Sequence, residues 1–155
     1  MATQQPKHQL LPLFQKNEVL FGHDGMPGLI ACELAGDDRI KIFSRDAGGA
    51  TAAATEPFRP LMLLEGDAPL KGWHGEAAIE KLAGSGAFNH LVLFPNLKQL
   101  DYAKAYLQKS TGKTPSAGDA PYWYFSDPLQ QFFLLSGKTH FLGMTFRELK
   151  RLQLD

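Results

Sequence analysis

Turn signals divide the first half of the chain into short runs of β-forming residues, and this spacing limits what the chain can fold into. Three runs, Val19–Phe21, Gly28–Leu34 and Arg39–Phe43, are separated and followed by turn sequences such as Asp-Gly, Gly-Asp-Asp and Asp-Ala-Gly-Gly. Such runs are typical of an antiparallel meander of strands. Leu61–Leu64 is apolar throughout and is predicted as a fourth, central strand.

The pattern becomes helical after residue 73. His74–Ala83 places Ala78, Ile79 and Leu82 on one face and is followed by Gly-Ser-Gly, so we predict a helix with a glycine end. His90–Phe94 is then predicted as a buried strand. The alternation of strand and helix over residues 60–109 predicts a split βαβ layer.

Two further helices begin with capping residues. Asn96, with Gln99 three positions later, resembles a capping box and predicts a helix through Leu107. Asp127-Pro128-Leu129-Gln130 predicts a second N-cap, and that helix is expected to end at Gly137. The predicted fold class is therefore α+β, with a mixed or antiparallel sheet.

The composition favours a single globular domain. The 155 residues are 44% hydrophobic, which is enough for one core. We predict a flexible, Gln- and Pro-rich arm over 1–16, one domain over 17–144, and a strand over 145–155. Because Leu149–Asp155 alternates late and ends without a turn, we expect the chain to be a fragment cut inside that strand.

Charge and cysteine content exclude several classes of protein. Sixteen basic and sixteen acidic residues cancel, so no overall field attracts nucleic acid or an anionic membrane. Residues 95–155 carry 8 Lys and Arg against 5 Asp and Glu, whereas residues 1–94 carry 8 against 11, which favours the C-terminal part for any phosphate contact. No apolar stretch approaches the ~20 residues that span a bilayer. The single Cys32 excludes an internal disulfide and lies in an apolar run, so we expect a buried thiol and a cytoplasmic protein.

No motif for nucleotide or metal chemistry is complete. Ser110–Thr114 resembles the end of a phosphate loop, but Leu107 stands where that motif requires its first glycine. The five histidines show no i, i+4 pair around a carboxylate. We therefore expect no catalytic residue and no bound cofactor within the 155 residues themselves.

Six residues are candidate DNA contacts. Tyr122 and Tyr124 alternate with Trp123 and Phe125, so one pair of rings could stack on bases. Packing into a core is the alternative for these rings. The other candidates are basic residues near the end of the chain that could contact phosphates: Lys138, Arg147, Lys150 and Arg151.

Several segments together resemble the N-terminal domain of bacterial family B DNA polymerases. Leu152–Asp155 looks like the start of the first exonuclease motif, in which an apolar strand leads into Asp-x-Glu. Phe58–Pro60 is similar to a Phe-Arg-Pro step of that domain, and Asp127–Leu135, with the following Gly137, resembles the helix upstream of the motif. Phe146–Asp155 resembles the lead-in strand.

This resemblance implies an accessory domain that supports template binding and places the RNase H-like 3′–5′ exonuclease domain of a DNA-directed DNA polymerase. It implies that Asp155 is a metal ligand in the full-length protein, with Mg²⁺ or Mn²⁺ bound. The implied partners are primer-template DNA and the exonuclease and polymerase domains of the same chain. The 155 residues alone are expected to be inactive, because they supply one carboxylate.

Two other readings stay open. The first is a stand-alone ligand-binding or regulatory α+β domain. The second, an independent nuclease, is less favoured because no second acid is placed to act with Asp155.

Overall fold

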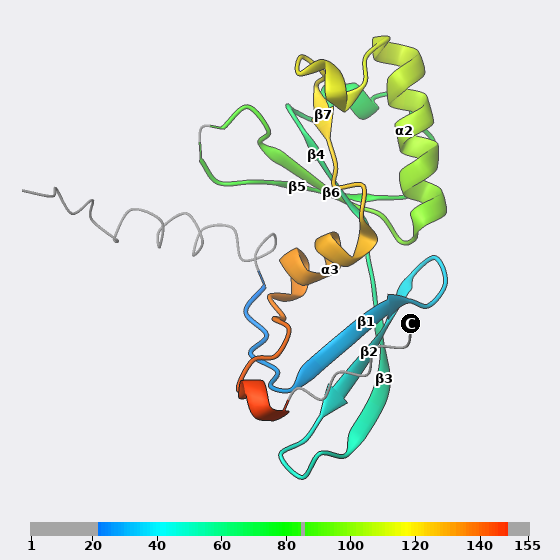
Figure 1. Ribbon diagram of the computed structural model, residues 1–155. Helices are drawn as coiled ribbons and strands as arrows, with labels where there is room; N and C mark the ends of the chain where they lie inside the picture. The colour runs from blue at the N-terminus through cyan, green and yellow to red at the C-terminus, as the bar shows by residue number, and fades with distance from the viewer. Residues whose placement is uncertain (1–21, 85, 149–155) are drawn as a thin grey trace, which may run out of the picture.

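Two antiparallel sheets and two α-helices make up residues 22–84 and 86–148, the part of the chain that the computed structural model describes (Figure 1). The first sheet has the order β1-β2-β3, with β1 (Leu29–Leu34), β2 (Arg39–Arg45) and β3 (Thr51–Pro57). The second has the order β5-β6-β4-β7, with β4 (Leu61–Leu64), β5 (Ala78–Lys81), β6 (His90–Leu93) and β7 (Tyr122–Trp123). The helices are α2 (Leu97–Thr111) and α3 (Pro128–Ser136), and there are short 3-10 turns η1 (Ala68–Leu70), η2 (Pro115–Ala117) and η3 (Phe146–Glu148). The predicted α+β class is confirmed.

The first sheet confirms two strands of the predicted meander and adds a third strand that was not predicted. β1 and β2 coincide with predicted runs, whereas Val19–Phe21 lies outside the described residues. β3 was missed because its Thr and Ala side chains form no apolar pattern. It pairs with β2 over its whole length, from Arg39↔Pro57 to Arg45↔Thr51. The pairing partner, not hydrophobic periodicity, therefore makes this segment a strand.

The helix predicted over His74–Ala83 is wrong. Residues 78–81 form β5, which pairs antiparallel with β6 from Ala78↔Leu93 to Lys81↔His90. A ten-residue segment is marginal as a helix on its own, because few hydrogen bonds repay its nucleation. Ile79 remains 44% exposed, so the apolar face that suggested the helix is not buried.

A split βαβ layer is present, but it consists of β6, α2 and β7 around β4 and does not include the helix predicted over His74–Ala83. β6 and β7 each pair antiparallel with β4, which lies between them. They are therefore parallel to each other, and α2 connects them. The central position predicted for Leu61–Leu64 is confirmed, in the second sheet instead of the first.

Both predicted helix starts are confirmed by their hydrogen bonds. Asn96 Oδ1 accepts from the backbone N–H of Gln99 at 3.0 Å, and Asp127 Oδ1 accepts from that of Leu129 at 2.8 Å. α3 ends at Gly137, as predicted, in the left-handed conformation with φ 73°.

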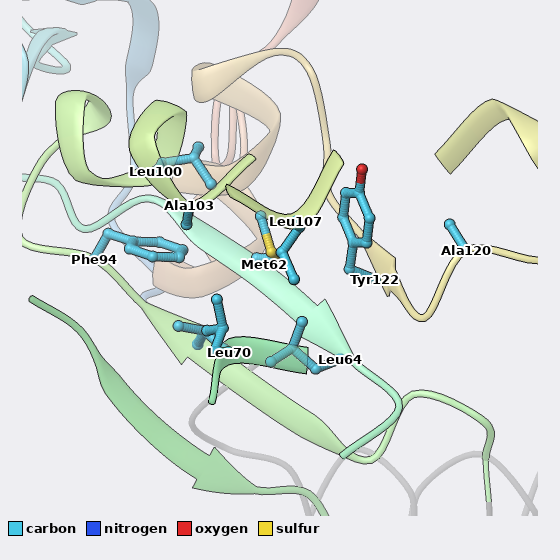
Figure 2. Close-up of a cluster of buried hydrophobic side chains, with 10 residues drawn as sticks. Met62, Leu64, Leu70, Phe94, Leu100, Ala103, Leu107, Ala120 and Tyr122 are labelled. Carbon is cyan, nitrogen blue, oxygen red and sulfur yellow. The ribbon is translucent and has the colours of Figure 1, made fainter. Parts of the chain in front are cut away.

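The central strands of the second sheet, β4 and β6, are buried on both faces, which explains their continuous apolar runs. One face packs against α2 and the residues around it (Figure 2): Met62, Leu64, Leu70, Val92, Phe94, Leu100, Ala103, Leu107, Ala120 and Tyr122. The other face presents Leu61, Leu91 and Leu93 to Leu134 and Leu135 of α3.

Helix α3 lies between the two sheets and packs on both (Figure 1). Its Phe132 is buried with Leu29, Ile40 and Ile42 of the first sheet and with Phe58. Helix α3 thus joins the hydrophobic cores of the two sheets, and Leu97 at the start of α2 also packs on both cores.

The strand predicted over 145–155 begins differently from the expectation. Phe146–Glu148 forms the turn η3, in which the Glu148 carboxylate accepts from the Thr145 backbone N–H at 2.5 Å and from its hydroxyl at 2.9 Å. These bonds lower the pKa of Glu148. The local carboxylate cap favours a turn over an extended start. Residues 149–155, like the predicted arm 1–16, lie outside the described residues.

Candidate functional site: the junction of the two sheets

Phe58–Pro60 carries the chain from the first sheet to the second. Phe58 is 2% exposed, and its backbone N–H donates to Asp38 O at 2.7 Å. The carbonyl of Pro60 accepts from Phe94 N at 2.8 Å. Arg59 is exposed and reaches Leu93 O through Nη2 at 3.4 Å. The Phe-Arg-Pro step is therefore a crossing between the sheets, held at one end by the turn between β1 and β2 and at the other by the residue that follows β6.

Gln131 of α3 connects the helix to this crossing. Its side chain is fully buried, with 1% exposure. Oε1 accepts from Leu61 N at 2.7 Å, and Nε2 donates to Phe125 O at 2.7 Å. Because a buried amide without partners is costly, these two bonds select one position of α3 against the start of β4.

An ion cluster around one buried ammonium group lies at the end of α3, and its Asp24 and Glu56 side chains are 45% and 32% exposed. The Lys138 side chain is 4% exposed, and its ammonium group bonds the carboxylates of Asp24 and, at 3.2 Å, Glu56. Burial lowers the pKa of Lys138, but hydrogen bonds to the two carboxylates outweigh it and raise the pKa overall. The hydrogen bond from Lys138 lowers the pKa of Asp24. The prediction of Lys138 as a surface residue free to contact phosphate is corrected, since its charge is enclosed and neutralised.

The predicted alternation of the aromatic segment is confirmed, and the core reading holds for Tyr122. Tyr122 and Tyr124 stack at 6.4 Å between ring centroids, while Trp123 and Phe125 meet at 4.4 Å. Tyr122 is 2% exposed within the core of Figure 2, and its hydroxyl donates to Lys113 O at 2.7 Å. Burial, with a smaller effect from Tyr124, raises the pKa of Tyr122. Its ring is not available for stacking on a base, which corrects that candidate.

The remaining candidates do not gather at one surface. Tyr124 is half-buried, with Lys104 Nζ 4.5 Å from its ring centroid. Arg147 is exposed in η3. Lys150, Arg151 and Asp155 lie outside the described residues. The described candidates thus occupy separate elements, and their role as DNA contacts stays a prediction for Tyr124 and Arg147.

Two hollows were missed by sequence reasoning. A cleft of about 500 Å³ at the end of the first sheet is lined by Met26, Pro27, Arg45, Asp46, Met144 and Glu148, among others. There Arg45 Nη1 donates to Glu148 O at 3.2 Å, while Nε is buried without a hydrogen-bond partner. A groove of about 320 Å³ at the junction is lined by residues that include Phe58, Arg59, Phe132 and Leu135. Each hollow combines segments far apart in sequence, so no local pattern indicates it.

Across 22–84 and 86–148, no group of three or more His, Cys, Asp or Glu side chains is placed to hold a metal ion. Cys32 is half-buried, and burial is the main cause of its raised thiol pKa.

Comparisons with family models, curated proteins and solved structures gave no match. Neither α2 nor α3, the two α-helices of the described part, is long and apolar enough to cross a membrane.

Proposed function

We propose that this chain is the N-terminal accessory domain of a family B DNA-directed DNA polymerase with a 3′–5′ proofreading exonuclease. One observation carries the proposal: two segments of the resemblance, far apart in sequence, are bonded to each other. Gln131, in the Asp127–Leu135 segment, bonds the backbone of Leu61 immediately after Phe58–Pro60 at 2.7 Å. The two segments that resemble the polymerase domain therefore meet at one place, the junction of the two sheets.

In this proposal the junction is a support that positions the start of the exonuclease domain. The Gln131 bonds hold α3 on the second sheet, and Lys138 holds its end on the first. Beyond α3, Phe141 N donates to Leu29 O at 2.8 Å and Leu142 O accepts from Gly28 N at 2.9 Å. The segment leading toward Asp155 therefore leaves from a defined position, as a site with narrow geometric tolerance requires.

The role of Asp155 in this proposal belongs to the full-length protein. Asp155 and further carboxylates of the full-length protein would hold Mg²⁺ or Mn²⁺, which would supply an activated water molecule and stabilisation of the leaving oxygen. The contribution of the described residues is to position the chain. Template DNA and the other domains of the polymerase would be the partners.

The test is to sequence the gene beyond codon 155 and assay the protein of the full reading frame. We expect Asp155 to be followed by an apolar residue and Glu, and the protein to extend primers and remove mismatched 3′ ends. Asp155→Ala should lower exonuclease activity by roughly two orders of magnitude or more, since a metal supplies several kcal/mol of transition-state stabilisation, and should leave primer extension intact.

Asp67→Ala is the matched control. Asp67 is exposed, and its side chain makes no capping hydrogen bond at η1. Both activities should match those of the wild type. Full exonuclease activity in Asp155→Ala, or a full-length protein without polymerase and exonuclease activity, would refute the proposal.

The cleft beside Arg45 favours one alternative, a ligand-binding or regulatory domain. Its volume of about 500 Å³ falls within the range of small-molecule sites. A reading frame that ends soon after codon 155, together with a ligand-dependent rise in melting temperature that Arg45→Met abolishes, would support this alternative over the polymerase.

A further inference from the structure

Over Thr51–Thr55 the outer edge of β3 is open and lacks the usual protection against strand pairing, whereas the strand ends in Glu56 and Pro57. β3 is the last strand of its sheet, so alternate backbone N–H and C=O groups along its outer edge have no strand to pair with among the described residues. Every residue of β3 except Glu56 is exposed. Protected edges carry charges, prolines or bulges. Thr51–Thr55 has none of these.

The sequence of this edge is self-complementary. Thr51-Ala52-Ala53-Ala54-Thr55 reads the same in both directions. If two copies align antiparallel about Ala53, Thr51 of each copy lies opposite Thr55 of the other, and Ala52 lies opposite Ala54. Thr–Thr pairs are favourable across strands, and no like charges oppose each other. A two-fold interface requires such a self-complementary surface.

The nearest charge does not oppose this pairing. Glu56 would lie opposite Ala50 of the second copy in this alignment. Its carboxylate is already paired with Lys138 at 3.2 Å on the face of the sheet that α3 covers. The approaching strand therefore meets small, neutral side chains.

The opposite edge of the sheet is less open. At the start of β1, Leu29 O accepts from Phe141 N, Gly28 N donates to Leu142 O, and the register shifts between Leu29 and Ala31. A bulge and a neighbouring segment of this kind hinder strand addition. Pairing should therefore close after two copies instead of continuing as a fibre.

We infer that β3 is a dimerisation edge, at which two copies of the chain pair antiparallel about Ala53 and join their three-stranded sheets into one. The occupant is a second copy because the edge complements itself. The pairing is weak, since one strand edge buries less than the ~1,000 Å² expected of a stable interface. This inference rests on the geometry of the edge and not on the polymerase proposal.

The experiment is sedimentation velocity of the 155-residue chain from about 10 µM to about 1 mM, the range in which so small an interface should associate. The wild type should shift from monomer to dimer. Ala53→Lys and Ala53→Glu should each raise the dissociation constant at least tenfold, because like charges then face each other across the two-fold axis. An equimolar mixture of the two variants should restore the dimer.

Ala31→Lys is the matched control. Ala31 is exposed and lies in the same cross-strand row, since it pairs with Phe43, which pairs with Ala53. Ala31→Lys therefore places the same charge on the same face of the sheet as Ala53→Lys, but at the opposite edge. It should leave the dissociation constant of the dimer unchanged. Restoration in the mixture also shows that the two Ala53 variants fold.

Four outcomes would overturn the inference. They are a wild type that stays monomeric over the whole range, a dimer that both Ala53 substitutions leave intact, an equal loss in Ala31→Lys, and a mixture that stays monomeric although each variant keeps the wild-type circular dichroism spectrum.

Discussion

Lys138 joins three segments through one buried ammonium group. It follows α3 and bonds Asp24, which precedes β1, and Glu56 of β3. Lys138→Met keeps the aliphatic stem but removes the cation that pairs with both carboxylates, so that Asp24 keeps only its bond from the Met26 backbone N–H. We expect a loss of about 2 kcal/mol in the free energy of unfolding, measured by urea denaturation at neutral pH. Lys98→Met is the control, because the Lys98 side chain is 83% exposed in its pair with Asp37 and should contribute little. If Lys138→Met and Lys98→Met lost the same free energy of unfolding, burial of the Lys138 ammonium group would not explain its contribution.

The same cluster predicts the sign of a pH dependence. Because Lys138 lowers the pKa of Asp24 below its usual 3.8, this stabilisation is complete above pH 3.8 and is lost as the pH falls through the lower folded-state value. Burial opposes the raised pKa of Lys138, but its carboxylate bonds prevail, so its contribution is complete below pH 10.5 and is lost as the pH rises through the higher folded-state value. The stability difference between wild type and Lys138→Met should therefore be constant near neutrality and shrink in strong acid. Urea titrations at several pH values measure it, and an unchanged difference in strong acid would refute the assignment.

At the scale of the elements, two helix ends with the same conformation should respond differently to one substitution. Gly112 and Gly137 end α2 and α3 with φ 69° and 73°. A Cβ on Gly112 would meet nothing within 4 Å, whereas one on Gly137 would overlap the carbonyl of Gly22. Gly112→Ala should cost only the left-handed conformation, about 1–2 kcal/mol. Gly137→Ala should cost about 2–5 kcal/mol in total, because overpacking is added.

Gly137→Ala should also separate the segment around Gly22 from α3. The two segments are joined by a backbone hydrogen bond in which Asp24 N donates to Ser136 O at 2.9 Å. We expect faster hydrogen exchange at the Asp24 amide in Gly137→Ala and no change there in Gly112→Ala. Equal exchange of the Asp24 amide in the two variants would show that the close approach of Gly137 to the Gly22 carbonyl is not needed to hold the two segments together.

At the scale of the whole molecule, the charge balance predicts weak DNA binding. Basic and acidic residues cancel, and the described basic candidates lie on separate elements. We expect binding of the 155-residue chain to primer-template DNA to be barely detectable at physiological salt and to weaken as the salt concentration rises from about 50 to about 200 mM. Fluorescence anisotropy measures this. Nanomolar affinity at physiological salt would contradict it and would favour an aromatic binding surface.

The features that could be predicted from the sequence depend on neighbouring residues. Asn96 and Asp127 bond backbone groups two or three residues away, and Gly137 supplies a conformation that few other residues adopt. The apolar run Leu61–Leu64 indicated a central strand because burial on both faces removes alternation. These interactions are local, so their residues reveal them.

The tertiary structure alone decided the features that depend on distant partners. β5 is a strand because β6 offers it an edge, and β3 because β2 pairs with it along its length. Lys138 is buried because Asp24 and Glu56, distant in sequence, neutralise it, and Tyr122 is enclosed by α2 and β4. Backbone pairing and the burial of charge depend on which segments meet in space. The sequence of this chain by itself therefore determined its helix caps, its turns and its α+β class, while the packing of its two sheets around α3 decided which candidate residues remain at the surface.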